Sequence, residues 1–126
     1  VKKIPTTFWA PVSKGFPEAV LYYMDLDNLD EGGQKVKKAI EEFLLDYDPA
    51  DFSVDYHFDQ LKSPMQVHQG GADEWVPTSW SDNFVQKVRD AGGDIKYYKY
   101  PKSDHNLRPD WDQVVARDLE FFRKFL

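Results

Sequence analysis

The chain contains no cysteine among its 126 residues, and this absence removes several chemistries at once. Disulfide bonds, thiolate metal sites and a cysteine nucleophile are all excluded. Long apolar stretches are also lacking, because the longest unbroken apolar run, residues 19–24, is far too short to span a bilayer. No signal peptide is visible, but the sequence begins with Val1 rather than Met, so we expect the natural N-terminus to lie further upstream. A soluble chain is predicted, with the cytoplasm slightly favoured as its location.

Positive charge is in short supply. Lys and Arg together number 16 against 22 Asp and Glu, which gives a formal net charge of −6 and a pI of about 5.0. An acidic surface argues against nucleic acid or an anionic membrane as the main partner. Hydrophobic residues nevertheless make up 41% of the chain and aromatic residues 16%, which is enough to build a core. The length suits one domain or part of a larger one.

Strand and helix patterns alternate along the chain. Strands are predicted where β-branched and aromatic residues are frequent, over residues 4–13, 65–68 and 94–101. Helices are predicted over residues 16–25, 32–49, 78–91 and 110–126. Such alternation indicates a parallel sheet with helices on its faces. The predicted fold class is therefore α/β, a three-layer αβα arrangement with a parallel sheet of about three strands.

Helical periodicity also predicts that apolar side chains gather on one face of a helix. In the helix over residues 32–49, one apolar face comprises Val36, Ile40, Phe43 and Leu44. For the last helix, which Asp110 could cap, the predicted inward residues are Trp111, Val114, Val115, Leu119, Phe122, Phe125 and Leu126.

Two residues with catalytic chemistry follow the second and third predicted strands. Asp73 comes just after one strand, and His105 comes just after the next. The carboxyl ends of neighbouring parallel strands meet at one edge of a sheet, so these two loops are expected to lie together. A carboxylate there can fix the tautomer of an imidazole and stabilise the imidazolium formed when it takes a proton from a nucleophile. We therefore predict that Asp73 faces His105.

Simpler interpretations exist for the same residues. Asp73 on its own could be a turn residue after Gly70 and Gly71, and His105 an ordinary loop histidine. Asp104 is favoured as a turn or capping group rather than as the partner of His105, because adjacent side chains point apart.

The remaining candidates are weaker. His57 and His68 are predicted to be structural. Because the three histidines match no compact ligand pattern, neither a metal nor a cofactor is expected. Trp75 lies beside Asp73 and is a candidate substrate contact at the rim of the site.

From residue 63 to the end, the sequence resembles the C-terminal part of an α/β-hydrolase. It is closest to the prolyl oligopeptidase-type serine peptidases and their esterase relatives. The matching motifs are G-x-x-D-x-x-V-P from Gly70 to Pro77, the loop that carries His105, and the final F-F-x-K-x-L from Phe121. The resemblance implies that Asp73 and His105 belong to a Ser-Asp-His triad acting on peptide or ester bonds. It also implies that residues 14–62 form a lid-like or inserted helical segment, and that "FWAPVS" is the strand after the nucleophile helix.

One element of that family is missing. No G-x-S-x-G motif is present, and Ser13, Ser53, Ser63, Ser79, Ser81 and Ser103 all lack its glycines. The nucleophile is expected upstream of Val1, so the chain alone is predicted to be inactive. Its partner would be the missing N-terminal half, or a second copy, pairing with the edge strand from Pro5 to Ala10. The alternative hypothesis is a non-catalytic α/β module for self-assembly or partner binding.

Overall fold

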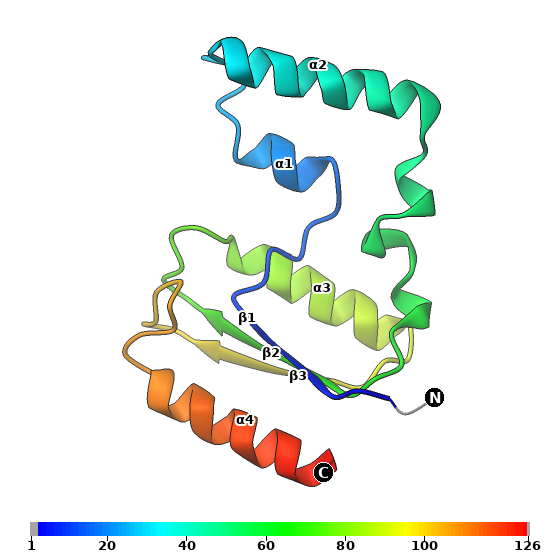
Figure 1. The fold of residues 1–126 in the computed structure, drawn as a ribbon. Helices are drawn as coiled ribbons and strands as arrows, with labels where there is room; N and C mark the ends of the chain where they lie inside the picture. The colour runs from blue at the N-terminus through cyan, green and yellow to red at the C-terminus, as the bar shows by residue number, and fades with distance from the viewer. Residues whose placement is uncertain (1–2, 126) are drawn as a thin grey trace. The chain divides into compact units, whose positions relative to one another are not determined.

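The computed structural model describes residues 3–125. Its strands are β1 (Thr6–Trp9), β2 (Met65–Gly70) and β3 (Ile95–Tyr100), which form one parallel sheet in the order β1-β2-β3 (Figure 1). The helices are α1 (Glu18–Tyr22), α2 (Glu31–Asp46), α3 (Thr78–Asp90) and α4 (Trp111–Phe125), and three short 3-10 turns lie at Pro49–Asp51, Val54–Tyr56 and Phe58–Gln60. The predicted α/β fold with a three-stranded parallel sheet is confirmed. None of the helices in the described part of the chain is long and apolar enough to cross a membrane.

The chain divides into two compact units. One unit combines the chain up to Ser13 with the chain from Phe58 onward, and it contains the sheet, α3 and α4. The other unit, Lys14–His57, contains α1 and α2. The division falls before Phe58 because that side chain belongs to the core of the first unit.

Helix α2 begins as its sequence predicts but does not bury the predicted face. Asp30 caps it by accepting a hydrogen bond from the Gly33 N–H at 2.7 Å. Of the residues on the predicted apolar face only Ile40 is buried, while Val36, Phe43 and Leu44 are exposed. Most of the apolar face is therefore left uncovered within this unit, which has too few other elements to cover a helix of this length. Phe43 instead contacts the ring of Phe16 at 5.7 Å between centroids.

Helix α3 covers one face of the sheet with an apolar core. Val67 at the centre of β2 is fully buried and packs among Phe84, Val85 and Val88 of the helix. Each such side chain contributes about 1.5–3 kcal/mol when it leaves water. Trp80, Phe84 and Val88 lie on one stripe of α3 and are buried. The helix is followed by Gly92 at φ +79°, a conformation that favours glycine.

Helix α4 lies on the opposite face of the sheet (Figure 1). This face is polar. Its inward residues are Val114, Asp118 and Phe121, so the predicted inward set was wrong for most members. Trp111, Val115, Leu119 and Phe125 are exposed, Phe122 is partly buried, and Leu126 lies outside the described residues. The reason is that alternate strand residues present hydrogen-bond donors here, and only a polar helix residue can satisfy them.

Asp118 is the centre of that polar face. Its Oδ1 accepts hydrogen bonds from Thr7 Oγ1 at 2.8 Å, Gln66 Nε2 at 2.6 Å and His68 Nε2 at 3.1 Å, and its Oδ2 accepts one from Trp9 Nε1 at 2.9 Å. The other ring nitrogen of His68 bonds to the Tyr100 hydroxyl at 2.8 Å. Burial lowers the pKa of His68, although the nearby Asp118 carboxylate opposes the shift. His68 is thus a neutral structural residue at pH 7, and its imidazole ties β2, β3 and α4 together.

Candidate active site

The turn after β2 holds the Asp73 carboxylate in a fixed place. Its Oδ1 accepts the backbone N–H groups of Trp75 at 2.8 Å and Val76 at 2.9 Å, and the carboxylate is fully buried. The Val76 side chain, 1% exposed, anchors the turn in the protein interior. Burial by itself raises the pKa of Asp73, but the hydrogen bonds from Val76, Trp75, His105 and Gln69 outweigh it, so the pKa is lowered. Asp73 is therefore a stable anion at neutral pH.

The loop after β3 is closed on itself around His105. The Leu107 N–H donates to the Asp104 carbonyl, the Asp104 N–H donates to the Arg108 carbonyl, and the Arg108 N–H donates to Asp104 Oδ1, each at 3.0 Å. Leu107 is 1% exposed and has a φ of 60°, a left-handed conformation that is uncommon for a non-glycine residue. Such conformations persist where the surrounding structure enforces them, and they cluster at functional sites. Asp104 is thus a turn residue that braces the loop.

The two loops are in direct backbone contact at Gly70 and Gly71. A Cβ atom on Gly70 would collide with the carbonyl oxygens of Ser103 and Asp104, and one on Gly71 would lie 2.8 Å from Pro101 Cα. The Gly71 N–H donates to the Tyr100 carbonyl at 2.7 Å, and the Ala72 N–H donates to the Ser103 carbonyl at 3.0 Å. Glycine is required here because the chains approach more closely than any side chain allows.

This contact places the His105 imidazole against the Asp73 carboxylate. His105 Nδ1 lies 3.0 Å from Asp73 Oδ2 and 3.2 Å from Oδ1, within ordinary hydrogen-bond range. A carboxylate only accepts, so Nδ1 carries the proton and Nε2 is left with its lone pair. In the described part of the chain, Nε2 makes no hydrogen bond, and the imidazole is 36% exposed. The arrangement can accept a proton at Nε2 and stabilise the resulting imidazolium through Asp73.

The other predicted site residues have different surroundings. Trp75 donates its backbone N–H to Asp73 while its side chain is exposed, so its role as a substrate contact stays a prediction. His57 belongs to the unit Lys14–His57. Within residues 3–125, no group of three or more acidic, histidine or cysteine side chains is arranged to hold a metal ion.

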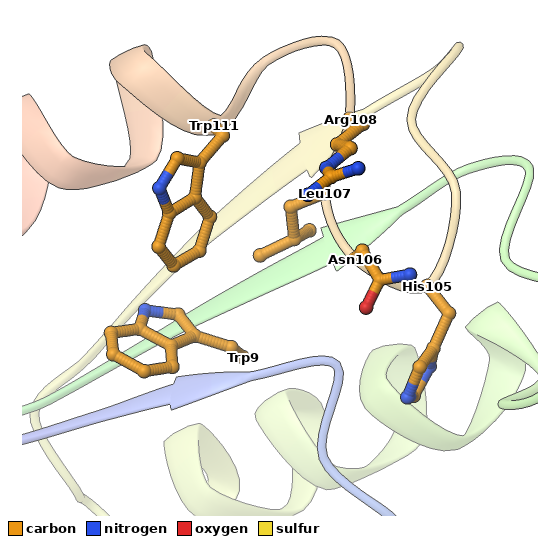
Figure 2. A pocket seen from close by; sticks show the side chains of 6 residues that line it. All are labelled: Trp9, His105, Asn106, Leu107, Arg108 and Trp111. Carbon is orange, nitrogen blue, oxygen red and sulfur yellow. The ribbon is translucent and has the colours of Figure 1, made fainter.

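A surface pocket of about 360 Å³ adjoins His105. It is lined by Trp9, His105, Asn106, Leu107, Arg108 and Trp111. Figure 2 shows the two indoles on one side of the pocket and His105 on the other, and the indole rings meet edge to face at 5.5 Å between centroids. This pocket was not predicted from the sequence, because Trp9 and Trp111 are far apart along the chain and Trp111 was expected to face inward.

Two buried polar residues behind Asp73 were also missed. Gln69 donates a hydrogen bond to Asp73 Oδ2 at 3.0 Å, and Ser81 on α3 donates one to Gln69 Oε1 at 2.7 Å. The available signal was Gln69 itself. It is a polar residue two positions after Val67, where strand alternation places another side chain toward the apolar face of α3.

The site contains no nucleophile within residues 3–125. Ser103 donates its hydroxyl proton to Asp110 at 2.8 Å, Ser81 donates to Gln69, and no described serine hydroxyl bonds to His105. A group that supplies the nucleophile would have to approach Nε2 from outside these residues.

Comparisons with known proteins find similarity among solved structures. No protein-family description matches the chain, and neither does any curated protein sequence. Among solved structures, the chain is similar to a thermophilic esterase from the planctomycete Thermogutta terrifontis, solved with butyrate bound. The TM-score is 0.47 and the identity 21%, and the match covers 80% of this chain but 36% of the esterase. The chain thus spans about a third of that protein's length.

Proposed function

We propose that the chain supplies the acid and the base of a Ser-Asp-His triad in a serine hydrolase that cleaves peptide or ester bonds. The observation that carries the proposal is the contact between His105 Nδ1 and the buried Asp73 carboxylate at 3.0 Å, with Nε2 left unoccupied. The motifs shared with prolyl oligopeptidase-type peptidases and their esterase relatives support the same assignment. The nucleophilic serine would come from outside residues 1–126.

In this mechanism, His105 Nε2 removes the proton of the serine hydroxyl as its oxygen attacks the substrate carbonyl carbon. Asp73 stays ionised and stabilises the imidazolium through Nδ1–H. His105 then gives the proton to the leaving amine or alcohol, and an acyl-enzyme forms. Water attacks the acyl-enzyme with the same His105 acting as base, which releases the acid product and restores the serine.

The edge of the sheet suggests where the nucleophile-bearing segment would dock. In the sheet formed by the described residues, β1 has a neighbour on one side only, and its outer N–H and C=O groups have no strand partner. Phe8 packs into the core of the same chain, against Phe84 at 6.1 Å between ring centroids, whereas Trp9 is 52% exposed. Unpaired edges of this kind recruit further strands. The partner we propose is the missing N-terminal half, with a second copy as the alternative.

Covalent labelling with a fluorophosphonate probe tests the function. The 126-residue chain should stay unlabelled, whereas the natural polypeptide that contains it should be labelled on one serine outside these residues. His105→Ala in that polypeptide should slow labelling by about 10³-fold or more, because the serine loses its base. His57→Ala is the matched control and should label normally. Labelling of a serine within residues 1–126, or no labelling of the natural polypeptide, would contradict the proposal.

A further inference from the structure

Gln69 is a fully buried amide between the Asp73 carboxylate and helix α3. Its Nε2 donates to Asp73 Oδ2 at 3.0 Å and to the Gly70 carbonyl at 3.1 Å, while its Oε1 accepts from Ser81 Oγ at 2.7 Å. Both N–H groups and the oxygen of the amide are therefore in use. A flipped amide would point its oxygen at two acceptors, so the orientation of Gln69 is fixed by its surroundings.

The two oxygens of Asp73 are held by different groups. Oδ1 accepts the backbone N–H groups of Trp75 and Val76, which belong to the turn itself. Oδ2 is the oxygen nearer to His105 Nδ1, and Gln69 is the other side chain among residues 3–125 that bonds to it. If Gln69 were absent, the turn would still anchor Oδ1, but the carboxylate could rotate about its Cβ–Cγ bond and move Oδ2 away from Nδ1.

We infer that Gln69, itself held by Ser81, is a positioning residue that fixes the plane of the Asp73 carboxylate so that Oδ2 accepts the hydrogen bond from His105 Nδ1–H. A role of Gln69 in catalysis rests on the proposed function, but the hydrogen bonds that position Asp73 are formed entirely by residues of this chain. A purely structural role would be to fill the space between β2 and α3. The two roles predict different results when Gln69 is replaced by an apolar side chain of similar size. A positioning role predicts that the His105 Nδ1 proton responds to the loss of the Gln69 hydrogen bonds, whereas a space-filling role predicts that it does not.

Nuclear magnetic resonance on the 126-residue chain, labelled with ¹⁵N at histidine and ¹³C at aspartate, separates these roles. Gln69→Met keeps the length of the side chain but removes its hydrogen bonds. We expect exchange of the His105 Nδ1 proton with water to accelerate by about tenfold, the factor associated with losing one hydrogen bond. The ¹³C titration of Asp73 should also move to higher pH, since a donor to the ionised form is lost. Gln86→Met, an exposed substitution on α3, is the matched control and should change neither signal.

Ser81→Ala provides a second variant in case Gln69→Met does not fold. It removes one buried oxygen and leaves Gln69 without the donor that holds its Oε1. The same two signals should move in the same direction by a smaller amount, while the exposed control Ser79→Ala leaves them unchanged. The inference is overturned if a folded Gln69→Met chain keeps the wild-type exchange rate of the His105 Nδ1 proton and the wild-type titration of Asp73. If only Ser81→Ala folds, wild-type values in that variant overturn it. This test needs no nucleophile. If it is passed while the natural polypeptide that contains the chain is not labelled by the fluorophosphonate probe, the proposed function is refuted and the positioning role stands.

Discussion

Replacing Asp118 with alanine should destabilise the sheet unit by about 3–5 kcal/mol. The carboxylate accepts four hydrogen bonds, from Thr7, Trp9, Gln66 and His68. Gln66 and His68 are 1% and 0% exposed, so neither donor can turn to water once its acceptor is gone. Each abandoned donor costs about 1–3 kcal/mol, which gives about 2–6 kcal/mol for the two. The partly buried donors of β1 can be rehydrated and add little.

Asp118→Asn should cost much less, because the two carboxylate oxygens carry unequal loads. Oδ1 accepts three of the hydrogen bonds and Oδ2 accepts only the one from the Trp9 indole. An asparagine that keeps its oxygen at the Oδ1 position loses one bond, and we expect a loss of about 1–2 kcal/mol. Trp9 should then become more exposed, with a red shift of indole fluorescence.

Urea titrations at pH 7, followed by circular dichroism and indole fluorescence, measure both losses from the midpoint and slope. Glu120→Ala is the control, an exposed acidic residue on the same helix that should change stability by less than about 0.5 kcal/mol. A loss below about 1 kcal/mol for Asp118→Ala would refute the reasoning from buried donors. Equal losses for the alanine and asparagine variants would refute the assignment of oxygens.

Four further outcomes are expected. The folded-state pKa of Asp73 is depressed below 3.8, so the stability that its ionised form contributes should be present above about pH 4 and vanish as pH falls through the folded pKa. Urea titrations should therefore show that the stability difference between wild type and Asp73→Asn shrinks as the pH is lowered. The pKa of His68 is depressed below 6.5, so the unfolded chain binds more protons and stability should fall as the pH drops below about 6.5; His68→Gln should flatten that slope. Gly70→Ala should push the loop after β3 away from the turn and remove the nuclear magnetic resonance signal of the His105 Nδ1 proton, whereas an unchanged signal would mean that the loops can separate without cost. Sedimentation equilibrium at micromolar concentration should show association through the β1 edge, and a clean monomer of 14.7 kDa would contradict it.

The sequence predicted the α3 side of the fold well. Period-two and helical patterns located β2, α3 and β3 because the contacts on this side are mostly apolar. Asp73 and His105 could be placed at one edge because parallel strands present their carboxyl ends together.

The α4 side could not be predicted in the same way. Asp118 lies at a helix position that hydrophobicity assigns to solvent, and its burial depends on donors contributed by β1 and β2. The exposure of the apolar face of α2 could not be predicted for a related reason. An amphipathic pattern shows that one face of a helix is apolar, but not which element covers that face. Gln69 was missed because its partners, Ser81 and Asp73, become neighbours only after the strand and helix are packed.

Neighbouring residues of β2 serve two separate polar groups, and this restricts how the strand can change length. Gln69 points to α3 and the Asp73–His105 pair, while His68 points to Asp118 and Tyr100 on the other side. The strand register pairs Met65 with Ile95, and His68 reaches Tyr100, two residues beyond its own strand partner Tyr98. Deleting one residue inside β2 would exchange the two sides of the strand, leave the amide facing α4 and the imidazole facing an apolar helix, and disrupt both groups at once. Length variation in this segment is therefore expected in the turns that flank α3, where an added residue lengthens a loop without altering which side any strand residue faces.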